Sequence, residues 1–490
     1  MKNVREMVQQ KNSSHPEKIL QFGEGNFLRA FADWMIDTAN DEGYYNGSIA
    51  LCQPIKEGEQ IAEIINRQEG IYTLVMRGIE EKEPVEKSKI ITSVKRCINA
   101  YRDYEALMDI AKSEELQVVI SNTTEAGISY KEGDKLSDCP PSSFPGKVCK
   151  FLYERYQFFK GDQTKGLLFL PVELIDNNGT QLKKIVLQYA KEWELEEEFV
   201  QWLLQSNKFA NTLVDRIVTG YPRDQMDYFT EKLGYEDDIL VTSELFHLWV
   251  IEGEKEWAEQ FPIDKSGVNI IWTEDVTPYK MRKVRILNGS HTSIVLAAYL
   301  AGHNIVLDFM QDPLFVEYFD HLVYDEVIPT IPLKEQELIE FADAVKDRFL
   351  NPYIKHNLLD ISLNSCSKFK ARCLPSMMAY IEKKQELPKW LVFSMAAFIR
   401  FYKGEMTDGK YMGVRADKTT YQIKDDEENL VFFNEVWKNN STEELVLAVL
   451  KNESLWDSDL STVEGLKEAL SGYLDSMEQK PMQEVIKDLL

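Results

Sequence analysis

The segment from Tyr279 to Thr292 carries the side chains in this sequence that are best suited to acid–base chemistry. It contains a lysine, an asparagine and a histidine at Lys283, Asn288 and His291. An ideal α-helix turns by about 100° and rises by about 1.5 Å per residue, which places all three within one half of its surface. Lys283 and Asn288 would then lie roughly 7.5 Å apart along the axis, a gap that a lysine stem largely spans. The three side chains could therefore converge on one small polar ligand.

Two interpretations of this segment are compatible with the spacing. Four basic residues occur within six positions, Lys280, Arg282, Lys283 and Arg285. They could form a solvated basic face. In a chain of net charge −25, however, a local basic cluster could also attract an anionic substrate that the protein as a whole would repel. Neighbouring positive charges favour the neutral amine of a lysine, which can act as a general base.

Gly289 lies inside the same predicted helix. A glycine in a helix interior costs about 1 kcal/mol relative to alanine. Its presence indicates that another group approaches the backbone closely at this point.

A second candidate site lies near the N-terminus. Lys18–Phe22 is predicted as a strand, and Gly23 and Gly25 follow it before an amphipathic segment from Asn26 to about Ala39. This is the beginning of a dinucleotide-binding turn, in which backbone N–H groups at the start of a helix hold a pyrophosphate. The third glycine position holds Leu28 instead. On the glycines alone, an ordinary strand–helix turn is an equally good interpretation.

Two further positions bear on nucleotide binding. The predicted strand 48–53 ends in Gln53, where many dinucleotide-binding proteins have an acid that binds the ribose 2′-hydroxyl. The buried strand 116–121 is followed by the polar run Asn122-Thr123-Thr124-Glu125. Ligands of doubly wound sheets bind at the carboxyl ends of strands, although the same polar residues could instead begin a helix.

These sites need two kinds of scaffold. Up to about residue 273, strands (including 48–53, 71–76, 116–121 and 166–171) alternate with helical patterns, which predicts a parallel sheet with right-handed crossovers. Beyond it, nearly every segment is predicted as helix, including 282–301, 335–348, 390–402 and 442–450. We therefore predict an α/β fold in two domains, a Rossmann-like doubly wound sheet domain over residues 1–276 and a mostly α-helical substrate and catalytic domain over residues 277–490.

The composition limits the kinds of partner and the cellular location that we expect for this protein. A net charge of −25 argues against nucleic acid, and no run of 18 apolar residues predicts a membrane span. The N-terminus is polar, and the six cysteines show no CxxC spacing, so a reducing cytoplasm is the expected location. The six histidines are scattered, and no metal site is predicted. The sequence does not indicate an oligomeric state.

Several long stretches resemble the long-chain polyol dehydrogenases of the mannitol dehydrogenase family. They are Gln21–Ala30, Ser121–Ile128, Thr212–Arg223, Lys283–His291 and Arg348–His356. The resemblance implies metal-independent hydride transfer with NAD, an N-terminal Rossmann-like domain and a helical C-terminal domain. It also implies that an arginine, here Arg29, follows the Gly-x-Gly-Asn-Phe turn in place of the third glycine.

The family's roles carry over to matching positions. Lys283 would be the general acid/base, Asn288 would stabilise the oxyanion, and His291 would help to hold the substrate. The expected cofactor-binding residues are Gly23, Gly25, Asn26, Phe27, Arg29, Asn122, Thr123, Glu125 and Asp215. The candidates for binding the substrate are Arg285, Lys355, His356 and Lys368, which charge alone does not rank.

Two positions depart from the polyol-oxidising members. Leu174 stands where we align an asparagine that shares the oxyanion role, and Asp360 stands where we align an arginine. Both departures suggest a substrate unlike mannitol. With the basic cluster, they favour a hexuronic keto acid and its hydroxy acid. A stereoisomeric keto acid, a mannitol-type polyol and a nucleotide-binding protein without catalysis are the alternatives.

Overall fold

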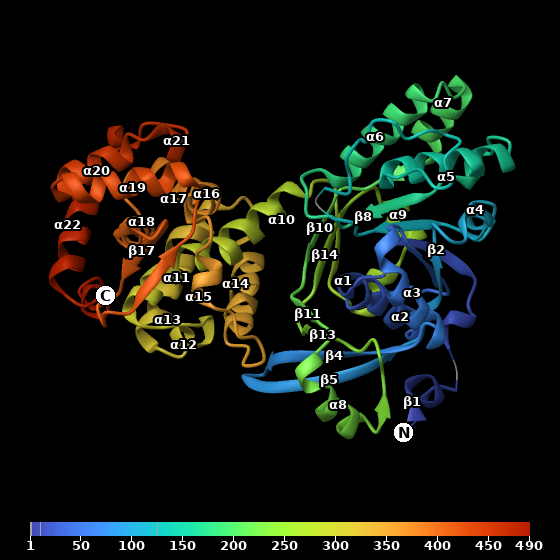
Figure 1. Cartoon of the computed structure of the whole chain (residues 1–490), viewed down its shortest axis with the longest axis horizontal. Helices are drawn as coiled ribbons and strands as arrows, with labels where there is room; N and C mark the ends of the chain where they lie inside the picture. Colours follow the sequence, from blue (N-terminus) through green and yellow to red (C-terminus); the bar gives the residue numbers. More distant parts are fainter. Residues whose placement is uncertain (1, 10, 125) are drawn as a thin grey trace. The chain divides into compact units, whose positions relative to one another are not determined.

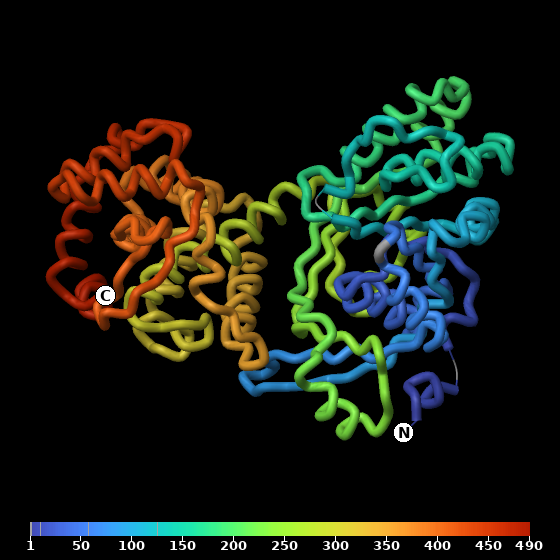
Figure 2. Tube along the Cα trace, viewed as in Figure 1, coloured from blue at the N-terminus to red at the C-terminus, as the bar shows by residue number. Residues whose placement is uncertain are grey.

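The computed structural model describes residues 2–9, 11–124 and 126–490. These residues form two compact units (Figures 1 and 2). The first comprises the chain up to Arg77 together with Val85–Val276, and the second comprises Gly78–Pro84 and Thr277–Leu490. The short segment Gly78–Pro84 therefore groups with residues that follow it by about two hundred positions, which no local pattern in the sequence indicates. Within the described residues, no helix has the length and apolar character needed to span a membrane.

The first unit is built on a six-stranded sheet in which every recorded strand pair is parallel. Its order is β6 (Val94–Asn99), β3 (Ser48–Gln53), β2 (Glu17–Phe22), β7 (Val118–Ser121), β8 (Leu168–Pro171) and β9 (Lys208–Phe209). The strand order reverses between β2 and β7, which is the switch point of a Rossmann-type sheet. The prediction of a doubly wound parallel sheet is confirmed.

Both faces of this sheet are covered, because alternate strand residues enter two different cores. Ile19 and Val118 pack into one core, whereas their neighbours Leu20 and Val119 pack into the other. The first core receives side chains of α1 (Asn26–Arg29), α2 (Ala32–Asp41) and α3 (Glu59–Arg67). The second receives those of α4 (Tyr104–Ala111), α5 (Phe144–Phe158), α6 (Asn178–Glu192) and α7 (Glu197–Ser206), labelled in Figure 1.

The strand predicted at 71–76 exists, but it does not join the main sheet. It is β4 (Tyr72–Glu80), in a four-stranded sheet of order β11 (Val218–Gly220), β13 (Val241–Glu244), β4, β5 (Glu83–Ile91). A third sheet contains β10 (Thr212–Asp215), β14 (Leu248–Glu252) and β15 (Ile270–Thr273). The partner strand β13 lies far along the chain from β4, so alternation of apolar residues predicts the strand but not its sheet.

The helix predicted from Asn26 to about Ala39 is interrupted. It consists of α1 and α2, separated by Ala30 and Phe31. Phe31 is fully buried and has non-helical backbone angles, φ −129° and ψ −85°. Its ring stacks on Phe27 at 5.0 Å and packs against Trp249 at 5.5 Å. The packing of this ring in the core outweighs the local helical pattern.

The second unit is mainly helical, as predicted. Its centre is α11 (Gly289–Ala301), buried on nearly every side and packed against α18 (Lys389–Phe401). A three-stranded antiparallel sheet that was not predicted from the sequence lies among the helices, β16 (Gly404–Thr407), β17 (Lys410–Val414) and β18 (Thr420–Ile423). The other helices used below are α10 (Thr277–Arg282), α14 (Glu335–Phe349), α15 (Leu358–Ile361), α16 (Ser365–Arg372) and α19 (Glu427–Asn439).

Candidate active site

The segment that carries the lysine and the asparagine is not an α-helix. Between α10 and α11 the chain forms a π-helix, η7, which begins at Lys283 and ends at Asn288. A π-helix pairs residue i with residue i+5, so residues five apart lie one above the other, much as residues four apart do in an α-helix. The ideal α-geometry used to interpret the sequence is wrong here. The π-geometry reduces the angle between Lys283 and Asn288 around the helix axis.

Asn288 and Gly289 mark the end of the π-turn. The half-buried amide of Asn288 has no hydrogen-bond partner among the described residues, so it remains available to a ligand. A Cβ on Gly289 would stand 3.1 Å from the carbonyl oxygen of Arg372 and 3.3 Å from that of Val284. The close approach predicted at Gly289 is confirmed, and the group that approaches is the last residue of α16.

His291 lies one turn further along, on α11. Its ring stacks on Phe349 at 4.0 Å with an interplanar angle of 3°, and His356 meets it edge-on at 5.2 Å. Its Nε2 atom is buried and has no hydrogen-bond partner in the described part of the chain. Burial first, and then the positive charges of nearby groups, lower the pKa of His291 well below the ordinary histidine value. His291 is therefore a neutral imidazole with one ring nitrogen available to a ligand.

The four substrate-binding candidates fall into two groups. His356 contacts His291, and Lys368 acts electrostatically on both histidines. Arg285 instead donates to the carbonyl oxygen and the hydroxyl of Thr330, at 2.9 Å and 3.0 Å. The side chain of Lys355 is exposed and makes no polar contact with the residues that the structure describes. The structure thus brings His356 and Lys368 to His291 and directs Arg285 to another helix end.

Arg372 joins this group, and it was not among the residues predicted from the sequence. It is half-buried on α16 beside Lys368, and its guanidinium donates to the Thr292 hydroxyl at 3.4 Å. The signal was present in the sequence, since Arg372 follows Lys368 by four residues and would share its helix face.

The glycine turn of the first unit lies at the switch point of the sheet. Gly23 has a φ of +122°, a conformation that favours glycine, and a Cβ there would be 3.0 Å from the carbonyl oxygen of Asn122. Gly25 precedes α1 with open space around it and provides no side-chain cap. Because α1 has only four residues, its helix dipole is small. What the turn offers to an anion is therefore its backbone N–H groups.

Gln53 ends β3 next to this turn. Its side chain is fully buried, and neither amide atom has a hydrogen-bond partner among the described residues. Buried polar groups are rarely left without a partner, so such an amide requires an explanation. A ribose hydroxyl would supply both a donor and an acceptor. The combination of Gly23, Gly25 and Gln53 fits a dinucleotide whose ribose is held by an amide rather than by an acid.

Ser121 and Thr123 are fixed by a buried carboxylate, whereas the Asn122 side chain donates to the carbonyl oxygen of Val172 at 3.3 Å. The backbone N–H and the hydroxyl of Thr123 both donate to Glu173 Oε1 at 3.0 Å, and Ser121 donates to Oε2 at 3.1 Å. Burial raises the pKa of Glu173, and these hydrogen bonds oppose the shift. The next residue, Leu174, is 64% exposed, so no second amide stands at this position.

The remaining cofactor-binding candidates differ in accessibility. Arg29 is 3% exposed, and its guanidinium donates to the carbonyl oxygens of Glu24 and Ile239 and to Asn26 Oδ1. These hydrogen bonds join Arg29 to other parts of the first unit and so stabilise the fold. Asn26 is exposed and Phe27 is half-buried, whereas Asp215 is buried at the end of β10. Glu125 lies outside the described residues.

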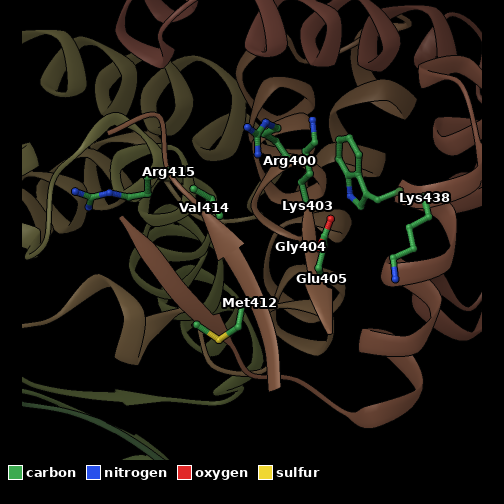
Figure 3. Close-up of a pocket in the computed structure, with 9 residues that line it drawn as sticks. Arg400, Lys403, Gly404, Glu405, Met412, Val414, Arg415 and Lys438 are labelled. Atoms are coloured by element: carbon green, nitrogen blue, oxygen red, sulfur yellow. The ribbon is translucent and has the colours of Figure 1, made fainter. Parts of the chain in front are cut away.

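A second cationic region in the same unit as η7 is a cavity of about 410 Å³ at β16, β17 and α19 (Figure 3). Its basic lining residues are Arg400, Lys403, Arg415 and Lys438. Arg400 lies 2.6 Å from a Glu478 oxygen, and Lys403 pairs with the same carboxylate. Arg415 lies 2.6 Å from Asp417. Three of the four cations are already paired with carboxylates, so this cavity is the weaker candidate for an anionic substrate.

Within the described residues, no three His, Cys, Asp or Glu side chains gather in a way that could hold a metal ion.

A Rossmann-type sheet followed by a helical unit that begins with this lysine, asparagine and histidine defines a two-domain dehydrogenase architecture. Comparison with known proteins agrees. The family model of the mannitol dehydrogenase Rossmann domain matches residues 17–265, and that of the mannitol dehydrogenase C-terminal domain matches residues 275–478. The chain belongs to the mannitol dehydrogenase family.

Relatives cover almost the whole chain. Proteins named altronate oxidoreductase from Escherichia coli O7:K1 and from Shigella flexneri are each 43% identical over 483 residues, which is 97% of this chain and 98% of theirs. Among solved structures, a ternary complex of Pseudomonas fluorescens mannitol 2-dehydrogenase with NAD and D-mannitol has a TM-score of 0.66 at 22% identity, covering 98% of this chain and 95% of its own. A substrate-free D-sorbitol dehydrogenase has a TM-score of 0.80 at 21% identity, covering 97% and 96%. These structures support the fold.

Proposed function

We propose that this protein is an NAD-dependent tagaturonate reductase, which interconverts D-altronate and D-tagaturonate. The observation that carries the proposal is the 43% identity to altronate oxidoreductases over 97% of the chain. The substrate is a six-carbon sugar acid, and the cationic surroundings of His291 suit its carboxylate. The six cysteines are free thiols, which suits a cytoplasmic enzyme.

NAD would be held by the first unit. The Gly23–Gly25 turn would receive the pyrophosphate on backbone N–H groups, and the unpaired amide of Gln53 would bind a ribose hydroxyl. Asn122, which donates to the Val172 carbonyl oxygen, and Thr123, which donates to Glu173, would line the site at the end of β7. The bound cofactor supplies a hydride to the carbonyl carbon and, in the reverse direction, accepts one.

Lys283 would move the proton. In reduction, the Lys283 ammonium donates a proton to the oxygen that becomes the new hydroxyl, and in oxidation its neutral amine removes that proton. Asn288, whose amide has no partner in the described chain, would donate a hydrogen bond to the developing oxyanion. The neutral ring of His291 would hold a substrate hydroxyl through its unpaired Nε2.

The test is to follow NADH absorbance with D-tagaturonate, D-fructuronate and D-fructose in separate reactions. We expect rapid oxidation of NADH with D-tagaturonate. Preference for D-fructuronate would move the protein to the sister reductase of the stereoisomeric keto acid. No oxidation with any of the three substrates, in protein that binds NADH, would contradict a catalytic role.

A further inference from the structure

Helix α16 presents two like charges on one face. Lys368 and Arg372 are separated by four residues, so their side chains are neighbours along the helix. Lys368 Nζ donates to the carbonyl oxygen of Ile361 at 2.8 Å, and Arg372 Nη1 donates to the Thr292 hydroxyl at 3.4 Å. In the part of the chain that the structure describes, neither makes an ion pair with a carboxylate. Such a like-charge pair destabilises a helix by about 0.2–0.5 kcal/mol, so the fold retains it at a cost.

The helix dipole does not account for this arrangement. Positive side chains are favourable in the last turn of a helix, and α16 ends with Lys370 and Arg372. Lys370 behaves as such a residue, with its Nζ 3.0 Å from an Asp457 oxygen. Lys368 lies in the middle of the helix, half-buried next to Arg372. A solvated basic helix end would not retain a second, partly desolvated cation there.

The shared face of Lys368 and Arg372 lies next to the candidate catalytic residues. Both cations act on His291, and α16 packs against α11. The carbonyl oxygen of Arg372 closes against Gly289, immediately after Asn288, and its guanidinium reaches Thr292, immediately after His291. Arg372 therefore lies beside the ligand-facing segment of the second unit.

The chemistry of this pair matches a carboxylate. A guanidinium offers planar, parallel N–H donors that fit the two oxygens of a carboxylate, and an adjacent ammonium adds a third donor. Asp425 acts electrostatically on Lys368, but no carboxylate among the described residues acts in this way on Arg372, and a neutral sugar hydroxyl would leave the Arg372 charge uncompensated. The pair therefore distinguishes an acid from the corresponding neutral sugar.

We propose that Arg372, supported by Lys368, binds the carboxylate of the substrate and makes the enzyme select a keto acid over the neutral ketose of the same carbon chain. This inference rests on the proposed function, because it assigns the acid group of that substrate to a place in the site. Lys368 is among the substrate-binding candidates predicted from the sequence, whereas Arg372 is assigned by its contacts in this structure.

The experiment compares kcat/KM for two matched pairs of substrates, D-tagaturonate with D-tagatose and D-fructuronate with D-fructose. The variants are Arg372→Met, Arg372→Lys and, as the matched control, Lys370→Met. The control removes one positive charge from the same helix at a residue that is paired with Asp457. A hydrogen bond to a charged group contributes about 1.5–3 kcal/mol, so Arg372→Met should lower kcat/KM for the keto acid by about 10- to 100-fold, mainly through KM. Turnover of the neutral ketose should change little, and Arg372→Lys should recover part of the loss.

The outcomes separate the two proposals. Equal losses on the keto acid and on the ketose would mean that Arg372 only maintains the fold of the site, and would overturn the inference. An unchanged kcat/KM for the keto acid in Arg372→Met, or a wild-type enzyme that does not prefer acids, would also overturn it. Absence of turnover on all four substrates in the wild type would instead refute the proposed function, and the inference with it.

Discussion

The second unit contains two cationic regions that differ in their partners. The pair Lys368 and Arg372, here called the α16 pair, has a carbonyl oxygen and a hydroxyl as its recorded acceptors. In the cavity of Figure 3, here called the β17 cavity, Arg400 and Arg415 each meet a carboxylate at 2.6 Å. Counting basic residues does not distinguish the two regions. The partners do, because a cation in an ion pair is already compensated, whereas neither member of the α16 pair forms an ion pair with a described carboxylate.

The difference has an energetic consequence. Removing one partner of a compensated pair leaves the other charge without its counter-ion. Substitutions of the paired residues in the β17 cavity should therefore lower the free energy of unfolding. Removing a cation from the α16 pair relieves repulsion in the unliganded protein and costs only binding. Function and stability should therefore respond in opposite ways in the two regions.

The largest effect should come from the residue that transfers the proton. Lys283→Met should lower kcat by about 10²- to 10⁴-fold, the usual contribution of a positioned acid or base, while NADH binding persists. Rapid-mixing measurement of NADH oxidation, together with fluorescence titration of NADH, checks both parts. Near-normal turnover in this variant would mean that η7 does not carry the proton-transferring residue. The α16 pair would then no longer be a better candidate than the β17 cavity for binding the substrate.

The second largest effect on kcat should come from Asn288. Its amide has no partner among the described residues, and Leu174 provides no second amide. Asn288→Ala should therefore lower kcat by about 10²- to 10³-fold with a small change in KM, as for loss of an oxyanion donor. A change confined to KM would indicate that Asn288 binds the ground state rather than the developing oxyanion.

A substitution in the β17 cavity should change stability rather than activity. Arg415 donates to Asn304 Oδ1 at 3.1 Å and lies 4.7 Å from the Tyr299 ring centroid, in addition to its pair with Asp417. Arg415→Met should lower the free energy of unfolding by about 1–2 kcal/mol through the first two contacts, and kcat/KM should stay at the wild-type value. Urea denaturation and steady-state kinetics measure the two quantities. A selective loss of keto acid turnover would instead assign the β17 cavity to the substrate.

A pH series sharpens the comparison at the α16 pair. Burial, together with the neighbouring Arg372, lowers the pKa of Lys368, so this lysine loses its charge at a lower pH than an ordinary lysine does. The charged form binds the carboxylate. KM for the keto acid should therefore rise as the pH increases through the lowered pKa of Lys368, by up to about tenfold, relative to KM for the neutral ketose. The ratio cancels the titration of groups that affect both substrates.

Lys368→Met provides the control for that series. In this variant the ratio of the two KM values should be higher at neutral pH and should no longer change with pH. A pH dependence that survives the substitution would assign it to another group.

The sequence predicted the parts of this molecule that depend on local pattern. Strand β3 has the predicted bounds, because its apolar residues alternate between two cores that lie on either side of the sheet. The sheet that β4 joins could not be predicted, since its partner β13 is distant in sequence. The three-stranded sheet of β16–β18 was also missed; much of its surface is exposed, so its strands lack the continuous apolar runs that revealed the buried strands of the first unit.

In the candidate site, too, the sequence predicted the residues but not the geometry that relates them. Lys283, Asn288 and His291 stand out by residue type and spacing, yet a single π-turn is too short to leave an apolar pattern by which the sequence would reveal it. Arg372 could be found from its spacing to Lys368 only once α16 is known to pack against α11. Gly289 was the useful local signal, since its missing side chain marked where the two helices meet.

The smallest predicted effect is also the most direct test of the difference between the two regions. In the unliganded enzyme, Arg372→Met removes one of two like charges four residues apart and its single recorded side-chain hydrogen bond, to Thr292, at 3.4 Å. Relief of the repulsion is worth about 0.2–0.5 kcal/mol, so the free energy of unfolding should stay the same or rise by about that amount. With D-altronate present, the wild type should have the higher free energy of unfolding, because only the wild type gains the full binding energy of the acid. A variant that is less stable than the wild type without ligand would show that Arg372 stabilises the fold as Arg415 does, and the distinction between the two regions would then fail.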